Sequence, residues 1–301
     1  MPQRACPKEF AMLAKSAKLC LVLLLGAGVS AAQRSEAVKK ANQPDASQIN
    51  CGGFFSDQKV GGDTHLVSGE DSTMKLTWTT GDYVHVNRGM NQGVKEGDLY
   101  TVVRMESDAN KVMWFKWQPK LLKAMGESYR DLGQVRIVKA EPKVSVAQVT
   151  FACGLMQRGD VLIPYQPRPV GPFKDPAKFD IFAGVSGKPV AMVVASKDWA
   201  QAVGQGDTVY VNLGTVQGVK PGDYFRIFHY QGTRAEMAPT EKDYQYKLFG
   251  FGSAPQRYEW NDLPRQIIGE GIVLSATKNS STVLITFTRS EVFTGDYVEI
   301  E

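Results

Sequence analysis

The sequence has few of the residues that usually bind metals or act as nucleophiles in enzymes. Only three histidines are present, His65, His85 and His229, and they show no HxH or HExxH spacing. The four cysteines form no CxxC pair, and neither a GxSxG motif nor a P-loop is found. These absences give no support to a zinc site, a serine hydrolase or a phosphate-binding loop. We predict no catalytic residue, no cofactor and no metal.

A strong charge of one sign is also missing. The formal net charge is +4, and residues 1–32 contribute four basic residues and one acidic residue, which leaves +1 for the rest. A nearly neutral chain has no electrostatic preference for nucleic acid or for an anionic membrane surface. Beyond residue 32 no apolar run is long enough to span a bilayer. We therefore predict no nucleic-acid partner and no transmembrane segment in the mature chain.

The one long apolar run, "LCLVLLLGAGV" at residues 19–29, lies near the start of the chain. Basic residues precede it, and the small residues of "SAAQ" follow it, which is the pattern of a secretory signal peptide. The pattern predicts that residues 1–32 are removed and that the product is exported to the periplasm or the cell surface. An uncleaved anchor is the alternative, and Met12 is an alternative start to Met1.

Two cysteines, Cys51 and Cys153, remain after that removal. An even pair in an exported protein indicates a disulfide, and two free buried thiols are the alternative. The bridge would hold the "NCGGFF" segment against the first domain, with an upper-end stabilisation of about 4–5 kcal/mol. The polar, aperiodic residues 33–50 are predicted to form a flexible tether.

Two parts of the chain repeat each other. Residues 81–98, "GDYVHVNRGMNQGVKEGD", match residues 206–223, "GDTVYVNLGTVQGVKPGD", at twelve of eighteen positions. The match resumes between residues 132–164 and 268–300, after an insertion that is eleven residues longer in the second copy. The sequence therefore predicts a duplicated domain.

Short alternating strands separated by Gly, Asp and Asn predict an all-β fold. We expect two tandem homologous small antiparallel β-barrel or sandwich domains, at residues 51–165 and 189–301. The proline-rich residues 166–188 predict a semi-rigid, extended linker. One short helix is expected in the first insertion, after Pro119.

A Gly-Asp pair precedes a strand six times, three times in each copy. A set of carboxylates could form a metal site, but glycine permits positive φ and aspartate hydrogen-bonds its local backbone, which favours turns. The aspartates are Asp82, Asp98, Asp160, Asp207, Asp223 and Asp296.

The insertions, residues 105–131 and 229–267, are where the copies differ and where function is expected. Both are rich in aromatic residues, which offer rigid area with a polar tip to protein or glycan partners. The alternative is that they form a satellite core over each barrel. The candidate partner- or glycan-binding residues are Trp114, Trp117, Tyr258 and Trp260.

The repeated "GD-x-V-x-V-N-x-G…Q-G-V-K-x-G-D" pattern, followed by "V-x-I-T…G-D-x-V", resembles β-rich modules of bacterial envelope proteins. It is similar to the C-terminal module of flagellar assembly protein T (FlgT) and to the region that follows LysM in some peptidoglycan-associated proteins. The likeness covers residues 64–165 and 189–301. It implies a non-catalytic scaffold, and it supplies no catalytic residues.

Together these features predict an exported, non-catalytic structural or adaptor protein of the bacterial cell envelope. Protein partners, or the peptidoglycan of the cell wall, would dock on the aromatic insertions. The alternatives are a glycan-binding protein, or a hydrolase whose site lies between the two copies.

Overall fold

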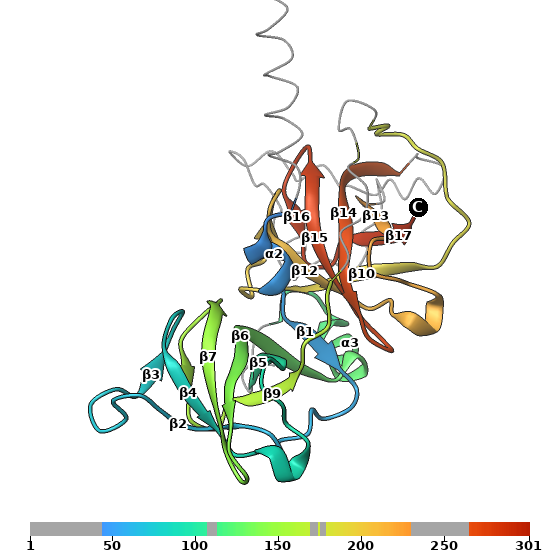
Figure 1. Ribbon diagram of the computed structural model, residues 1–301. Helices are drawn as coiled ribbons and strands as arrows, with labels where there is room; N and C mark the ends of the chain where they lie inside the picture. The colour runs from blue at the N-terminus through green and yellow to red at the C-terminus, as the bar shows by residue number, and fades with distance from the viewer. Residues whose placement is uncertain (1–43, 107–112, 169–173, 175–178, 230–264) are drawn as a thin grey trace, which may run out of the picture. The chain divides into compact units, whose positions relative to one another are not determined.

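The computed structural model describes residues 44–106, 113–168, 174, 179–229 and 265–301 (Figure 1). Strands are the dominant regular structure of this part of the chain, which confirms the predicted all-β class. Two short α-helices accompany them, α2 (Ala46–Asn50) and α3 (Gln118–Met125). The second confirms the helix predicted in the first insertion. No helix within the described ranges is long and apolar enough to cross a membrane.

Helix α2 corrects the predicted flexible tether, which was expected to extend through Asn50. Asp45 caps the helix: its Oδ1 accepts a hydrogen bond from the backbone N–H of Gln48, and the Gln48 Oε1 accepts one from the Asp45 N–H. This reciprocal arrangement is a capping box, which satisfies two N–H groups that a helix start otherwise leaves unpaired. The segment is polar, but its last residues are ordered.

The first copy forms one seven-stranded antiparallel sheet with the path β2-β4-β7-β6-β5-β9, to which β1 adds by pairing with β6. A bridge between His65 and Val161 brings the two ends of this path together. Strands β3 and β8 pair separately, and the short 3-10 helix η1 (Met90–Gln92) follows β4. The strands are β1 (Phe54–Ser56), β2 (Leu66–Gly69), β3 (Thr77–Trp78), β4 (Tyr83–Val86), β5 (Leu99–Glu106), β6 (Glu127–Ala140), β7 (Ser145–Ala152), β8 (Met156–Gln157) and β9 (Val161–Pro164).

The second copy forms a closed antiparallel barrel in the order β10-β12-β15-β14-β13-β17. Strands β11 and β16 pair separately, and η3 (Thr215–Gln217) follows β12. The strands are β10 (Val190–Ser196), β11 (Ala202–Val203), β12 (Thr208–Val211), β13 (Tyr224–His229), β14 (Gln266–Ala276), β15 (Ser281–Thr288), β16 (Val292–Phe293) and β17 (Tyr297–Ile300).

The two copies share strand order, register and irregularities. His85 pairs with Val146 across β4 and β7, and the corresponding Tyr210 pairs with Thr282 across β12 and β15. Two register shifts interrupt the β6–β7 ladder, and two interrupt the β14–β15 ladder at the equivalent positions. Because a one-residue slip would exchange the two faces of a strand, equal register means that corresponding residues point the same way.

Each copy has its own apolar interior. Leu66, Val84 and Val135 lie in the first interior, and Val193, Val209 and Phe225 lie in the second, all of them buried. The side chains that face inward alternate along each strand with side chains that face outward, as the pleat requires. The outward side chains are therefore the ones available for contacts beyond each sheet.

The six Gly-Asp pairs form turns, as predicted. In each pair the Asp Oδ2 accepts a hydrogen bond of 2.6–2.9 Å from the backbone N–H three residues earlier. Each glycine has a positive φ, between 87° and 108°. The glycines are Gly81, Gly97, Gly159, Gly206, Gly222 and Gly295. The six Gly-Asp pairs therefore have a structural role, which is to form the turns that reverse the chain.

The described residues of the linker are anchored to both copies. Arg168 binds Asp131 of the first copy, and the Ile181 carbonyl accepts a hydrogen bond from the Ile267 N–H of the second. The ring of Phe179 packs edge-on against Phe287 at 5.0 Å between centroids. These contacts anchor the described linker residues to the two copies.

Candidate functional site

The two copies meet where residues 48–55 lie across the outer side of the second barrel. The Tyr210 hydroxyl donates a 3.0 Å hydrogen bond to the Gly52 carbonyl, and the Thr282 hydroxyl donates a 2.8 Å bond to the Gly53 carbonyl. A Cβ on Gly53 would lie 2.6 Å from the Tyr210 hydroxyl oxygen. Glycine is therefore needed there for a close backbone approach.

Phe55 is the aromatic anchor of this contact. Its side chain is only 2% exposed, and its ring lies 5.0 Å from the ring of Tyr210. It belongs to an apolar cluster that joins both copies, with Val194 and Ala195 from β10. Strand β1, which carries Phe55, pairs at the same time with β6 of the first copy. The "GGFF" segment thus links the two copies.

The first insertion contributes to the same contact. Leu122 and Met125 of α3 are buried in the cluster around Phe55, and Gln118 donates a 2.8 Å hydrogen bond to the Val194 carbonyl. Phe115 is fully buried, and a Cβ on Gly295 of the second copy would lie 3.4 Å from its ring. The satellite-core alternative therefore describes this part of the first insertion.

The predicted aromatic site residues have different positions. Trp117 lies at the surface with 45% of its area exposed, and the Lys116 ammonium lies 5.2 Å from its ring centroid. Trp114 is half-buried, and its backbone N–H donates to the Gln118 Oε1. Tyr258 and Trp260 lie outside the described residues. The structure therefore leaves Trp117 available for a partner.

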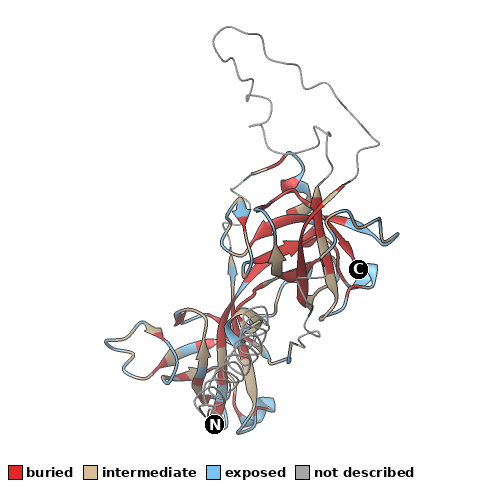
Figure 2. Ribbon diagram, turned by 90° about the horizontal axis from the view of Figure 1, so that it is seen from above, coloured by how far each residue is buried: buried red, intermediate tan, exposed pale blue. Residues whose placement is uncertain are grey.

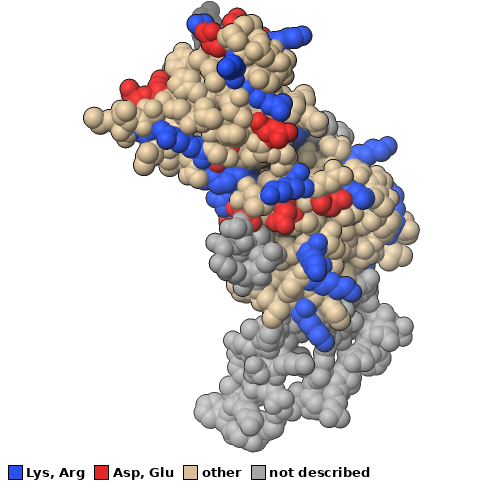
Figure 3. Space-filling view, turned by 90° about the horizontal axis from the view of Figure 1, so that it is seen from below, with Lys and Arg blue, Asp and Glu red and all other residues tan. Residues whose placement is uncertain are grey.

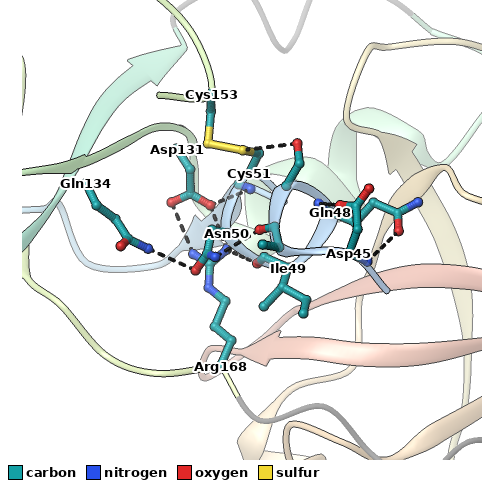
Figure 4. Close-up of a disulfide and its surroundings, with 12 residues drawn as sticks. Asp45, Gln48, Ile49, Asn50, Cys51, Asp131, Gln134, Cys153 and Arg168 are labelled. Carbon is teal, nitrogen blue, oxygen red and sulfur yellow. Dashed lines mark hydrogen bonds and ion pairs between the residues drawn. A yellow bond between two sulfur atoms is a disulfide. The ribbon is translucent and has the colours of Figure 1, made fainter. Parts of the chain in front are cut away.

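The predicted disulfide is present between Cys51 and Cys153 (Figure 4). It ties the start of the "GGFF" segment to the end of β7. Next to it, the buried carboxylate of Asp131 accepts hydrogen bonds from the Gly53 N–H at 2.8 Å and from Arg168 at 2.7 and 3.1 Å. Arg168 also donates to the Ile49 carbonyl at 2.9 Å. The N-terminal segment, the linker and β6 are therefore joined at one ion pair.

The part of the outer side of the second barrel around β10, β12, β14 and β15 is covered by these contacts, and we call it the covered face. Leu274 and Leu284 of this face pack with Ile272 against Ile49 of α2. All of its residues have an exposure of 2% or less. The covered face consists of Val194, Ala195, Tyr210, Ile272, Leu274, Ser280, Thr282 and Leu284.

The side chains of the equivalent side of the first copy are exposed or half-buried, and we call this side the open face. Val67, Val138 and Val144 are 37%, 41% and 42% exposed, respectively. The contrast is visible in Figure 2, where the strands of the second barrel are mostly red and those of the first copy alternate with tan and blue. The open face consists of Val67, Ser68, His85, Arg136, Val138, Val144, Val146 and Gln148, the counterparts of the covered face in the same order.

Near the end of the second copy, charged side chains line a cavity of about 260 Å³. Lys174 of the linker lies 2.9 Å from Glu270 and also contacts Glu301. Burial raises the pKa of Glu270; it acts in the same direction on Glu301, but the hydrogen bond and charge of Lys174 lower the pKa of that carboxyl overall. These charges pair with one another and hold the linker on the barrel.

Charge elsewhere is mixed. Figure 3 shows Lys and Arg side chains beside Asp and Glu side chains on the face that it draws. This agrees with the nearly neutral charge of the chain beyond residue 32. No group of three or more metal-ligating side chains occurs among the residues that the structure describes.

Neither a scan against protein-family models nor a search of curated proteins finds a match for this chain. The resemblance to envelope modules therefore stays a prediction. Sequence reasoning missed the open face, since Val67, Val144 and Arg136 carry no motif. The signal that could have revealed it is the repeat alignment. In that alignment Arg136 corresponds to Ile272 and Gln148 corresponds to Leu284, so polar residues of the first copy replace apolar residues of the second.

Proposed function

We propose that this chain is an exported, non-catalytic adaptor of the bacterial cell envelope that binds a protein partner. The observation that carries the proposal is the pair of equivalent faces. On the second copy, this side of the fold binds an aromatic-bearing polypeptide segment through Phe55. On the first copy, the same side presents exposed valines to solvent.

The remaining features support a rigid body that presents surfaces. The first insertion fills the contact between the copies with Phe115, Leu122 and Met125. The Gly-Asp carboxylates serve the turns. The disulfide fits an oxidising compartment. The predicted signal peptide supports export, and Trp117 offers a second surface for contact.

The experiment is affinity capture from envelope extracts of the native host, using the oxidised protein as bait. One stoichiometric protein partner supports the adaptor. Co-sedimentation with purified peptidoglycan that is lost in Trp117→Ala or Trp260→Ala supports glycan binding instead. Turnover of an ester or glycoside panel that a carboxylate substitution abolishes would overturn the proposal. The contact between the copies combines buried apolar side chains with hydrogen bonds from Tyr210, Thr282 and Gln118 to backbone carbonyls, an arrangement that holds the copies together.

A further inference from the structure

We propose that the open face is the docking site for a different protein, which covers it with a short segment carrying an aromatic side chain. This inference rests on the proposed adaptor function and names the chemistry of the partner. It is argued from the covered face, where the fold already holds such a segment.

The first step is that the two faces are built alike. Val67 and Ser68 correspond to Val194 and Ala195, because the same register shift occurs between β2 and β4 as between β10 and β12. His85 corresponds to Tyr210, because His85 pairs with Ser68 and Tyr210 pairs with Ala195. A segment lying on β4 and β7 would therefore meet side chains with the spacing that residues 48–55 meet on β12 and β15.

The second step is the occupant seen on the covered face. Its backbone approaches the barrel closely at Gly52 and Gly53, and the Phe55 ring packs on Tyr210. Ile49, six residues before Phe55, packs against Ile272, Leu274 and Leu284. The occupant is thus a short segment with two anchors, one aliphatic and one aromatic.

The third step is the difference between the faces. The hydroxyls of Ser280 and Thr282, which donate to backbone carbonyls of the occupant, are replaced by Val144 and Val146. The aromatic end of the open face is therefore more apolar at these two positions. On the covered face, Ile272 packs against Ile49. Its counterpart on the open face is Arg136, which is exposed. An acidic residue of the partner would pair with Arg136, about six residues before the aromatic anchor.

The fourth step excludes a second molecule of this protein as the occupant. In every molecule of the protein, residues 48–55 are held by the disulfide at Cys51, by the pairing of β1 with β6 and by the covered face itself. The segment would have to leave all three to reach another molecule. These contacts keep residues 48–55 away from the open face of another molecule, and the inference therefore commits to a different protein.

The test uses the full oxidised chain and a synthetic peptide with the sequence of residues 46–56, changed by Cys51→Ser and Ile49→Glu. Valine methyl NMR spectra are recorded during titration. We expect shifts at Val67, Val138 and Val146, and at least tenfold weaker binding of a peptide that also carries Phe55→Ala. The peptide with native Ile49 should bind more weakly than the Glu peptide, and Arg136→Ala in the protein should remove that difference.

Two protein variants complete the design. Val67→Glu with Val146→Glu should abolish binding, whereas Val216→Glu, at an exposed position on η3 of the second copy, should leave it unchanged. Unchanged methyl spectra elsewhere show that the double variant is folded. Absence of shifts on the open face at millimolar peptide, or equal binding of the Phe55→Ala peptide, overturns the inference. If two molecules of this protein form a dimer through the open face, the inference that the occupant is a different protein is overturned.

These outcomes are separable from those of the adaptor proposal. A stoichiometric partner that maps to Trp117 would leave the adaptor function in place while the open-face inference fails. Failure to capture any partner, together with enzymatic turnover, would remove the adaptor function itself.

Discussion

At the residue scale, Asp131 of β6 joins the N-terminal segment and the linker to the first copy. Its side chain is fully buried, and it receives hydrogen bonds from the N-terminal segment and from the linker. A buried carboxylate is tolerated only when it is paired and hydrogen-bonded, and removing one partner leaves the other uncompensated.

Asp131→Asn should therefore destabilise the protein by about 3–5 kcal/mol, measured as the free energy of unfolding in urea. The matched control is Asp198→Asn, at an exposed position, which should change stability by no more than about 0.5 kcal/mol. Equal effects of the two substitutions would show that the Arg168 ion pair does not hold the segments together.

A second residue-scale difference separates the copies. In the first copy, Arg104 forms a bidentate ion pair with Asp160 at 2.7 and 2.8 Å. In the second copy the corresponding pair is His229 with Asp296, whose atoms Nδ1 and Oδ1 lie 3.4 Å apart. Arginine stays charged at all relevant pH values, whereas histidine titrates near neutrality.

The neighbouring Asp296 carboxylate raises the pKa of His229 above its ordinary value, against the opposing effect of burial. A raised pKa in the folded state means that protonation favours folding. The stabilisation is fully present below the unfolded pKa of about 6.5 and is lost as the pH rises through the folded pKa.

We expect the melting temperature of the wild type to fall across this pH window by more than that of His229→Gln. Thermal unfolding at a series of pH values measures both. The outcome that would contradict this prediction is an identical pH dependence in the two proteins.

At the element scale, strand β1 and helix α3 act together as the connection between the copies. Phe55 is an aromatic anchor of that contact, and it is almost completely buried. Phe55→Ala should lower the free energy of unfolding by about 3–5 kcal/mol, because it removes apolar area and leaves a cavity. Chemical denaturation measures this loss, and Phe182→Ala, at a position that is 60% exposed, is the control with a small expected effect.

The sequence predicted individual elements better than their contacts. The alternation of apolar residues predicted the class, the repeat predicted the duplication and Pro119 predicted the start of the short helix, because each signal is visible in the sequence itself. Helix α2 was missed because its capping box lies in a polar segment without apolar periodicity. The partners of Phe55 and Phe115 could not be predicted, since they depend on how one copy packs on residues far away in the sequence.

At the scale of the whole molecule, the disulfide fixes the segment on which the contact between the copies depends. Its loop spans 102 residues of sequence separation. The chain-entropy model assigns such a crosslink about 4–5 kcal/mol, as an upper-end value.

Cys51→Ser with Cys153→Ser should therefore lower stability by up to about 4–5 kcal/mol and should reduce the coupling between the copies, so that one unfolding transition separates into two. Differential scanning calorimetry measures both effects. A double variant that unfolds in a single transition at the wild-type temperature would contradict the role given to the bridge.

The central claim is that one face of the duplicated fold is covered within the chain and the equivalent face is covered by a partner in the envelope. Carbene footprinting with mass spectrometry tests it on the unmodified protein, in purified form and in the native envelope. The account predicts that β2, β4 and β7 are labelled in the purified protein and protected in the envelope, while β10, β12 and β15 are protected in both. Equal labelling of β2, β4 and β7 in the two states would contradict it.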